Sequence, residues 1–137
     1  MHPFTYSTEI SVRFQDIDLF DHVNNVAYAA YLEEARIQFF EDAVGVVLGE
    51  SDDGFALVHL EVEYERQIEY GDSVEVLLRV LELGSSSIAM DYQVRADGRV
   101  AATAETVVVP FDGATGESFP IPDAWRESLA EYENTPE

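Results

Sequence analysis

Residues 24–43, NNVAYAAYLEEARIQFFEDA, decide the fold class of this chain. Apolar residues recur there three and four positions apart, at Tyr28, Leu32, Ala35, Phe39 and Ala43. This spacing puts them on one face of a long amphipathic helix that runs from about Val26 to Ala43. Asn24 suits the N-cap, because its side-chain oxygen can accept from an unpaired backbone N–H. Such a helix needs an apolar surface against it, and a β-sheet is the natural one.

Five segments around this helix alternate between apolar and polar residues, as strands with one buried face do. They cover residues 4–14, 57–70, 73–83, 86–96 and 99–109, with a loop expected at 49–54. Asp97-Gly98 predicts a type I′ hairpin, because both central residues of that turn need positive φ. We therefore predict an α+β fold: one long central helix wrapped by an antiparallel sheet of about five strands, the last four forming a meander. The final strand is expected to stop at Pro110, and a short helix is expected near residues 125–132.

The final strand also indicates an oligomer. Val107 and Val109 are apolar beside Val108, so both faces of the strand need cover. The helix covers one face, and a second subunit is the expected cover for the other.

The composition describes one acidic domain. The chain has 137 residues, about the size of a single domain. We see no repeat or linker, and we expect a core over about 4–112 and a tail over 113–137. The 28 Asp and Glu against 7 Arg, with no Lys, give a net charge of −21, which disfavours nucleic acid and anionic membranes as partners. Because the acidic residues are spread along the whole chain, we interpret them as a halophilic surface; the alternative is a face that recruits a basic partner.

Several classes of protein are excluded by what the sequence lacks. There is no Cys, so disulfides, thiol nucleophiles and Cys-ligated zinc are excluded. No apolar stretch approaches the roughly 18 residues of a membrane span. The first residues have neither the basic nor the apolar region of a secretory signal, so a cytoplasmic location is expected.

Residues whose side chains could act in catalysis or binding concentrate between positions 13 and 36. Asp16, Asp18, Asp21 and His22 lie in a loop that leads into the start of the helix. Free N–H groups and the positive end of the helix dipole could polarise a carbonyl there, with Asp18 opposite as nucleophile or general base. Two other interpretations remain open: an ordinary solvated, capped loop, and a metal-binding loop. The second lacks the Gly and the closing Glu of an EF-hand.

The order of motifs resembles the hotdog-fold acyl-CoA thioesterases, in the 4-hydroxybenzoyl-CoA thioesterase-like branch. The matching motifs are R-x-x-D-x-D at Arg13–Asp18, H-V-N-N at His22–Asn25, Y-x-x-Y at Tyr28–Tyr31, E-x-A-R at Glu33–Arg36, Tyr70-Gly71-Asp72 and Gly84-Ser85-Ser86-Ser87. The resemblance spans residues 4 to about 122. It implies hydrolysis of an acyl-CoA by a homodimer or a dimer-of-dimers tetramer. It implies no cofactor and no metal, since CoA is part of the substrate.

The resemblance also assigns residues. Asp18 matches the catalytic carboxylate, His22 a group that orients or exchanges a proton, and Asn25 a donor to the thioester oxygen. Asp16 would support the site. Substrate contacts are expected from Asn24, Val26, Tyr28, Ser86 and Ser87. Glu33 and Arg36 are expected to form an orienting ion pair, and packing against the sheet is the preferred interpretation of Tyr28 and Tyr31.

Two rival functions remain open. A hotdog hydratase or dehydratase would carry D-x-N-P-x-H, with Asp and His five apart, whereas Asp18 and His22 are four apart and Asn-Pro is missing. A catalytically silent hotdog module that binds acyl-CoA or acyl carrier protein is the other rival, and only an activity measurement separates it from the enzyme.

Overall fold

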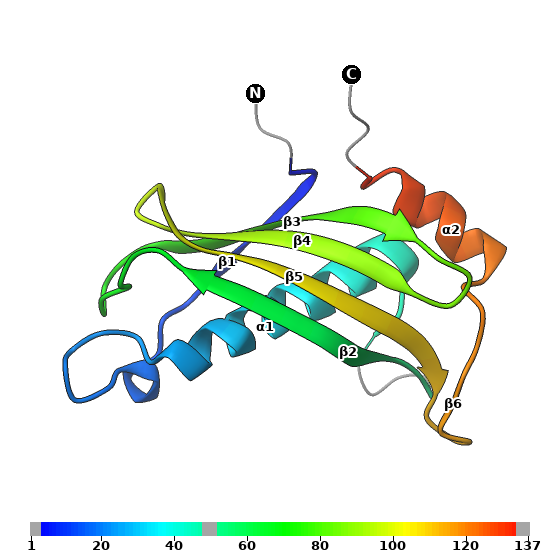
Figure 1. The fold of residues 1–137 in the computed structure, drawn as a ribbon, viewed down its shortest axis with the longest axis horizontal. Coiled ribbons are helices and arrows are strands. Elements are labelled where there is room, and N and C mark those ends of the chain that lie inside the picture. Colours follow the sequence, from blue (N-terminus) through cyan, green and yellow to red (C-terminus); the bar gives the residue numbers. More distant parts are fainter. Residues whose placement is uncertain (1–3, 48–51, 134–137) are drawn as a thin grey trace.

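One long helix lies across one face of a curved antiparallel sheet in the computed structural model (Figure 1), which describes residues 4–47 and 52–133. The elements in chain order are β1 (Tyr6–Ile10), a 3-10 turn (Phe14–Asp16), α1 (Asn25–Val44), β2 (Asp53–Tyr64), β3 (Val74–Leu83), β4 (Ile88–Ala96), β5 (Arg99–Asp112), β6 (Glu117–Ser118) and α2 (Asp123–Ala130). The predicted fold class is confirmed. Part of the loop expected at 49–54 lies outside the described residues, and Asp53 and Gly54 already belong to β2.

The central helix is capped at both ends, and the predicted Asn24 N-cap is confirmed. The Asn24 side chain accepts a hydrogen bond from the Val26 N–H at 2.7 Å, which satisfies one of the free donors of the first turn. At the other end, Gly45 has φ 75° and donates its N–H to the Glu41 carbonyl. The apolar face predicted from the sequence is buried against the sheet.

The sheet order, β1-β3-β4-β5-β2, corrects the predicted four-strand meander. Of these five strands, only β3, β4 and β5 form a meander, whereas β2 pairs with β5 and forms the edge opposite β1. The chain leaves β2 at Tyr64 and crosses through residues 65–73 before β3 begins. This segment packs against the start of α1, where the Ile68 carbonyl accepts from the Val23 N–H at 2.7 Å. The alternation predicted for 57–70 therefore ends six residues early.

Two turn predictions had opposite outcomes. The hairpin at Asp97-Gly98 is confirmed, with φ of 51° and 80°. The prediction that the last strand stops at Pro110 is wrong, because β5 continues to Asp112. Pro110 is tolerated because β4 begins opposite Val108, so no β4 residue pairs with the proline, which lacks an N–H.

Strand β2 is a long, exposed edge. Four of its apolar side chains are exposed to solvent: Leu57, Val58, Leu60 and Tyr64. An edge that presents free backbone groups and apolar side chains is a surface that proteins normally cover. Its exposure in the isolated chain is consistent with the predicted second subunit.

The acidic surface has few compensating charges. Within the described ranges, two ion pairs join arginines to carboxylates, Arg13–Asp16 and Arg79–Asp91. His59 also lies 3.6 Å from Glu61, a contact that is an ion pair only when the imidazole is protonated. Most of the negative charge is therefore not neutralised by the protein itself. Neither of the two helices in these ranges is long and apolar enough to cross a membrane.

We expect the melting temperature to rise by about 10 °C or more between about 0.1 M and about 3 M KCl, because added cations screen the repulsion between carboxylates. Differential scanning calorimetry at fixed pH measures this directly. A melting temperature that does not change with salt would contradict the halophilic interpretation.

Candidate active site

The loop between β1 and α1 is folded back on itself and tied to its neighbours. Ile17 and Val23 form an antiparallel bridge, and the Asp18 N–H donates to the His22 carbonyl at 2.9 Å. At its exit, the Asn24 N–H donates to the Asp16 carbonyl at 2.7 Å. The loop is therefore held in one shape directly before the first turn of α1.

Asp16 holds this loop in place through its side chain. Its buried carboxylate accepts from the Arg13 N–H at 3.0 Å and from the Tyr31 hydroxyl at 2.8 Å. Burial alone would raise the pKa of Asp16, but these two hydrogen bonds and the Arg13 charge outweigh it and hold the pKa below its usual value. Both hydrogen bonds go to Oδ2 and tie the loop to Arg13 and to α1, while the side chain is largely buried.

The pKa of Asp16 predicts an acid-dependent contribution to stability. Because this pKa is lower in the folded state, the contribution is fully present above the unfolded value of about 3.9 and is lost as the pH falls through the folded value. We expect the difference in free energy of unfolding between the wild type and Asp16→Asn to shrink over that range. Urea titrations in molar KCl at a series of pH values measure it. A difference that stays constant down to the lowest pH would contradict the assignment.

Asp18 lies on the opposite side of the loop, at an open depression of ≈ 440 Å³. The depression is lined by Asp18, Phe20, His22, Asn24, Asn25 and Gln67. Asp18 Oδ1 accepts from the backbone N–H of Phe20 at 2.8 Å and of His22 at 3.4 Å. Asp18 Oδ2 has no hydrogen bond to any residue in the described ranges, so one carboxylate oxygen is held in place and the other is available to a ligand.

The first turn of α1 offers one backbone donor at this depression. The Val26 N–H is taken by the Asn24 side chain and the Ala27 N–H by the Asn24 carbonyl. The Asn25 N–H has no acceptor among the described residues. This group, at the positive end of the helix dipole, is suited to polarise a carbonyl oxygen. The N–H of Val26, which we expected to contribute, is already used by the cap.

Other residues assigned from the sequence lie away from the depression. Tyr28 is fully buried and donates to the Arg66 carbonyl at 3.0 Å, which agrees with the packing interpretation. Val26 is exposed and does not line the depression. Ser86 and Ser87 lie in the β3–β4 turn beside α2, at the other end of the sheet from the start of α1 (Figure 1). Of the catalytic and substrate-binding residues assigned from the sequence, four therefore lie together at the depression within one chain: Asp18, His22, Asn24 and Asn25.

The predicted ion pair between Glu33 and Arg36 is wrong. No contact within ion-pair distance joins them in the described structure. Glu33 is exposed, whereas Arg36 turns beneath the helix and is buried, with its Nη1 3.4 Å from the Tyr92 hydroxyl. A spacing of three residues allows such a pair, but the Arg36 side chain instead donates a hydrogen bond to Tyr92 on β4.

Two lining residues, Phe20 and Gln67, were not indicated as site residues by the sequence. Phe20 lies in the loop itself, whereas Gln67 comes from a distant segment. It follows β2 in the segment that crosses to β3, and its neighbour Ile68 accepts the hydrogen bond from Val23. Sequence alternation suggested a strand there, so no signal placed this amide beside the loop. His22 also meets this segment, through an antiparallel bridge to Glu69.

One long helix wrapped by an antiparallel sheet, with a carboxylate loop at the helix start, is the hotdog fold of thioester-cleaving enzymes. The model of the Thioesterase-like superfamily matches residues 12–129. The chain therefore belongs to this superfamily, and the family assigns it to the thioester hydrolases.

Individual relatives match this chain over most of their length, and a solved structure among them shares its fold. A thioesterase from Thermus thermophilus, solved with coenzyme A and Zn, is 37% identical with a TM-score of 0.86 and covers 100% of both chains. The 1,4-dihydroxy-2-naphthoyl-CoA hydrolase of Synechococcus elongatus is 27% identical, over 90% of this chain and 94% of the relative. The long-chain acyl-CoA thioesterase FadM of Escherichia coli is 26% identical, over 89% and 95%. In the described part of this chain, no three His, Asp or Glu side chains cluster in a way that could hold a metal ion.

Proposed function

We propose that this chain hydrolyses an acyl-CoA thioester to the free acid and CoA, with Asp18 as its reactive carboxylate. One observation carries the proposal: Asp18, which has an unpaired carboxylate oxygen, and Asn25, whose N–H has no acceptor among the described residues, line the same depression. A thioester between them would meet a polarising donor at its oxygen and a carboxylate at its carbon. The named activities of the two CoA-thioester hydrolases above support CoA as the leaving group.

The reaction needs little help at the leaving group, because a CoA thiolate departs readily. In one route, Asp18 Oδ2 attacks the carbonyl carbon, the C–S bond breaks and CoA thiolate leaves; water then hydrolyses the mixed anhydride. In the other route, Asp18 takes a proton from water as the water oxygen attacks the same carbon, and the C–S bond then breaks to release CoA thiolate. In both, the Asn25 N–H stabilises the negative oxygen, a contribution of about 10²–10³ in rate. His22, beside the same depression, can orient the water or return the proton.

The proposal includes a homodimer formed through β2. A two-fold axis perpendicular to the sheet would pair the β2 edges of two subunits antiparallel and keep both helices on one face. The exposed Leu57, Val58 and Leu60 would then be covered. Two such dimers could associate through the outer faces of their sheets into the tetramer suggested by the resemblance.

Release of CoA thiol, followed with a chromogenic disulfide reagent in molar KCl, tests the function. Short, long and aromatic acyl-CoAs are compared with the same acyl groups on a carrier protein. We expect turnover of at least one CoA thioester, unaffected by a chelator. A folded protein that binds CoA but releases no thiol from any substrate would favour the silent binding module. Turnover that is lost on chelation would favour the metal-loop interpretation.

A further inference from the structure

Arg36 is a buried cation with little compensation. Its side chain is 7% exposed, and its one hydrogen bond within the described ranges is the 3.4 Å contact to the Tyr92 hydroxyl. Burial raises the pKa of Tyr92 although the Arg36 charge opposes it, so the phenol stays neutral and does not balance the cation. A guanidinium has five N–H donors, and most of these are left without a protein acceptor.

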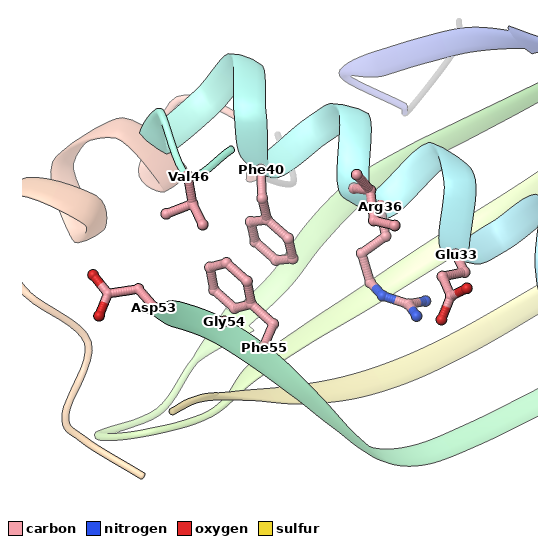
Figure 2. Close-up of a pocket in the computed structure, with 8 residues that line it drawn as sticks. Glu33, Arg36, Phe40, Val46, Asp53, Gly54 and Phe55 are labelled. Atoms are coloured by element: carbon pink, nitrogen blue, oxygen red, sulfur yellow. The ribbon is translucent and has the colours of Figure 1, made fainter. Parts of the chain in front are cut away.

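The free donors of Arg36 border a separate cavity. This cavity of ≈ 200 Å³ lies between the second half of α1 and the start of β2 (Figure 2). Its apolar walls include Phe40 and Phe55, whose rings stack at 3.8 Å, and Val46. The carboxylates of Glu33 and Asp53 also line it, and both residues are exposed. The cavity therefore has apolar walls, the accessible guanidinium donors of a largely buried arginine, and two exposed acidic residues.

The proposed dimer would place this cavity beside the catalytic depression of the other subunit. Antiparallel pairing sets the start of β2, at Phe55, near the end of the partner's strand, at the partner subunit's Tyr64. Within each chain, the Tyr64 hydroxyl donates to the Asn25 carbonyl at 3.1 Å, so the end of β2 marks the start of α1. A thioester held at one subunit's Asn25 would thus direct its acyl group toward the other subunit's Arg36.

We propose, building on the proposed function, that this cavity holds the distal end of the acyl group and that Arg36 selects acyl groups carrying a hydroxyl or keto oxygen there. A plain alkyl end would displace water from the Arg36 donors and leave them unsatisfied, which is costly in a buried site. An oxygen at that end restores the hydrogen bonds. A terminal carboxylate is less favoured than a neutral oxygen, because Glu33 and Asp53 line the same cavity.

The test compares kcat/KM for matched thioesters, namely an alkanoyl-CoA, its ω-hydroxy form and its ω-carboxy form, over a series of chain lengths. At the preferred length, we expect the ω-hydroxy substrate to exceed the alkanoyl substrate by about tenfold to a hundredfold, with the ω-carboxy substrate between them. Arg36→Met should lower kcat/KM for the ω-hydroxy substrate and raise it for the alkanoyl substrate. Arg95→Met is the matched control: Arg95 bonds Gln93 and does not line the cavity, so its selectivity ratio should equal that of the wild type.

Three results would overturn the assignment of Arg36. One is a wild type that hydrolyses both substrates equally at every length. Another is an Arg36→Met ratio equal to that of the wild type; if this variant does not fold, the wild-type comparison over the chain-length series alone decides. If no thioester is cleaved, the proposed function fails instead. Calorimetric affinities for the same substrates then test the selectivity of Arg36. Equal affinities for the ω-hydroxy and alkanoyl substrates would overturn it.

Discussion

Asp18→Asn is expected to lower kcat for acyl-CoA hydrolysis by about 10³-fold while leaving the fold and CoA binding intact. The amide can still accept the hydrogen bonds from the Phe20 and His22 N–H groups that shape the loop. It can neither attack a carbonyl nor take a proton from water. The variant therefore loses the reactive carboxylate while the loop keeps its shape. Thiol release and calorimetric CoA binding, measured on the same preparation, separate the two effects.

Asp21→Asn is the matched control. Asp21 is an exposed carboxylate in the same loop, has φ 65° and does not line the depression. Asn adopts this backbone conformation readily, so the variant should turn over substrate at close to the wild-type rate. If Asp18→Asn keeps most of the activity and Asp21→Asn loses it, the carboxylate has been misassigned.

Leu60→Glu should convert the proposed dimer to a monomer and lower turnover, because the monomer lacks the acyl cavity that we propose the partner supplies. Leu60 is 39% exposed on the β2 edge, and the two-fold axis would bring two copies of the new carboxylate into one interface. Repulsion between them adds to the cost of burying each charge. Light scattering coupled to size exclusion, in molar KCl, measures the mass, and thiol release on the same fractions measures activity.

Leu81→Glu controls for the substitution itself. Leu81 has the same 39% exposure but lies on β3, away from the β2 edge. It should leave the β2 dimer and its activity in place. A Leu60→Glu protein that remains a dimer with full activity would show that the subunits associate elsewhere.

The central helix and most strands could be predicted from local patterns. Apolar spacing, the Asn24 cap and the Asp97-Gly98 turn each depend on neighbouring residues and are read directly from the sequence. The position of β2 could not be predicted in this way. Its apolar alternation resembles that of a buried strand, yet pairing with β5 rather than β3 depends on contacts between residues far apart in the chain.

The candidate site also contains residues that could be predicted from local sequence and residues that could not. The loop and the helix start are contiguous in sequence, so Asp18, His22, Asn24 and Asn25 could be named together. Gln67 reaches the depression only because the segment after β2 packs back on α1. Arg36 was expected to pair with Glu33, because a spacing of three residues allows such a pair; its contact with Tyr92 beneath the helix joins residues far apart in the chain and could not be predicted from local spacing.

The claim at the centre of this account is that the thioester carbonyl lies between Asp18 and the start of α1. A crystal structure with an acyl-CoA analogue whose sulfur is replaced by methylene, leaving an unreactive ketone, tests it most directly. We predict the ketone oxygen at about 2.7–3.2 Å from the Asn25 backbone nitrogen, with the Asp18 carboxylate facing the carbonyl carbon. A ketone bound elsewhere, for example at the turn carrying Ser86 and Ser87, would contradict the account.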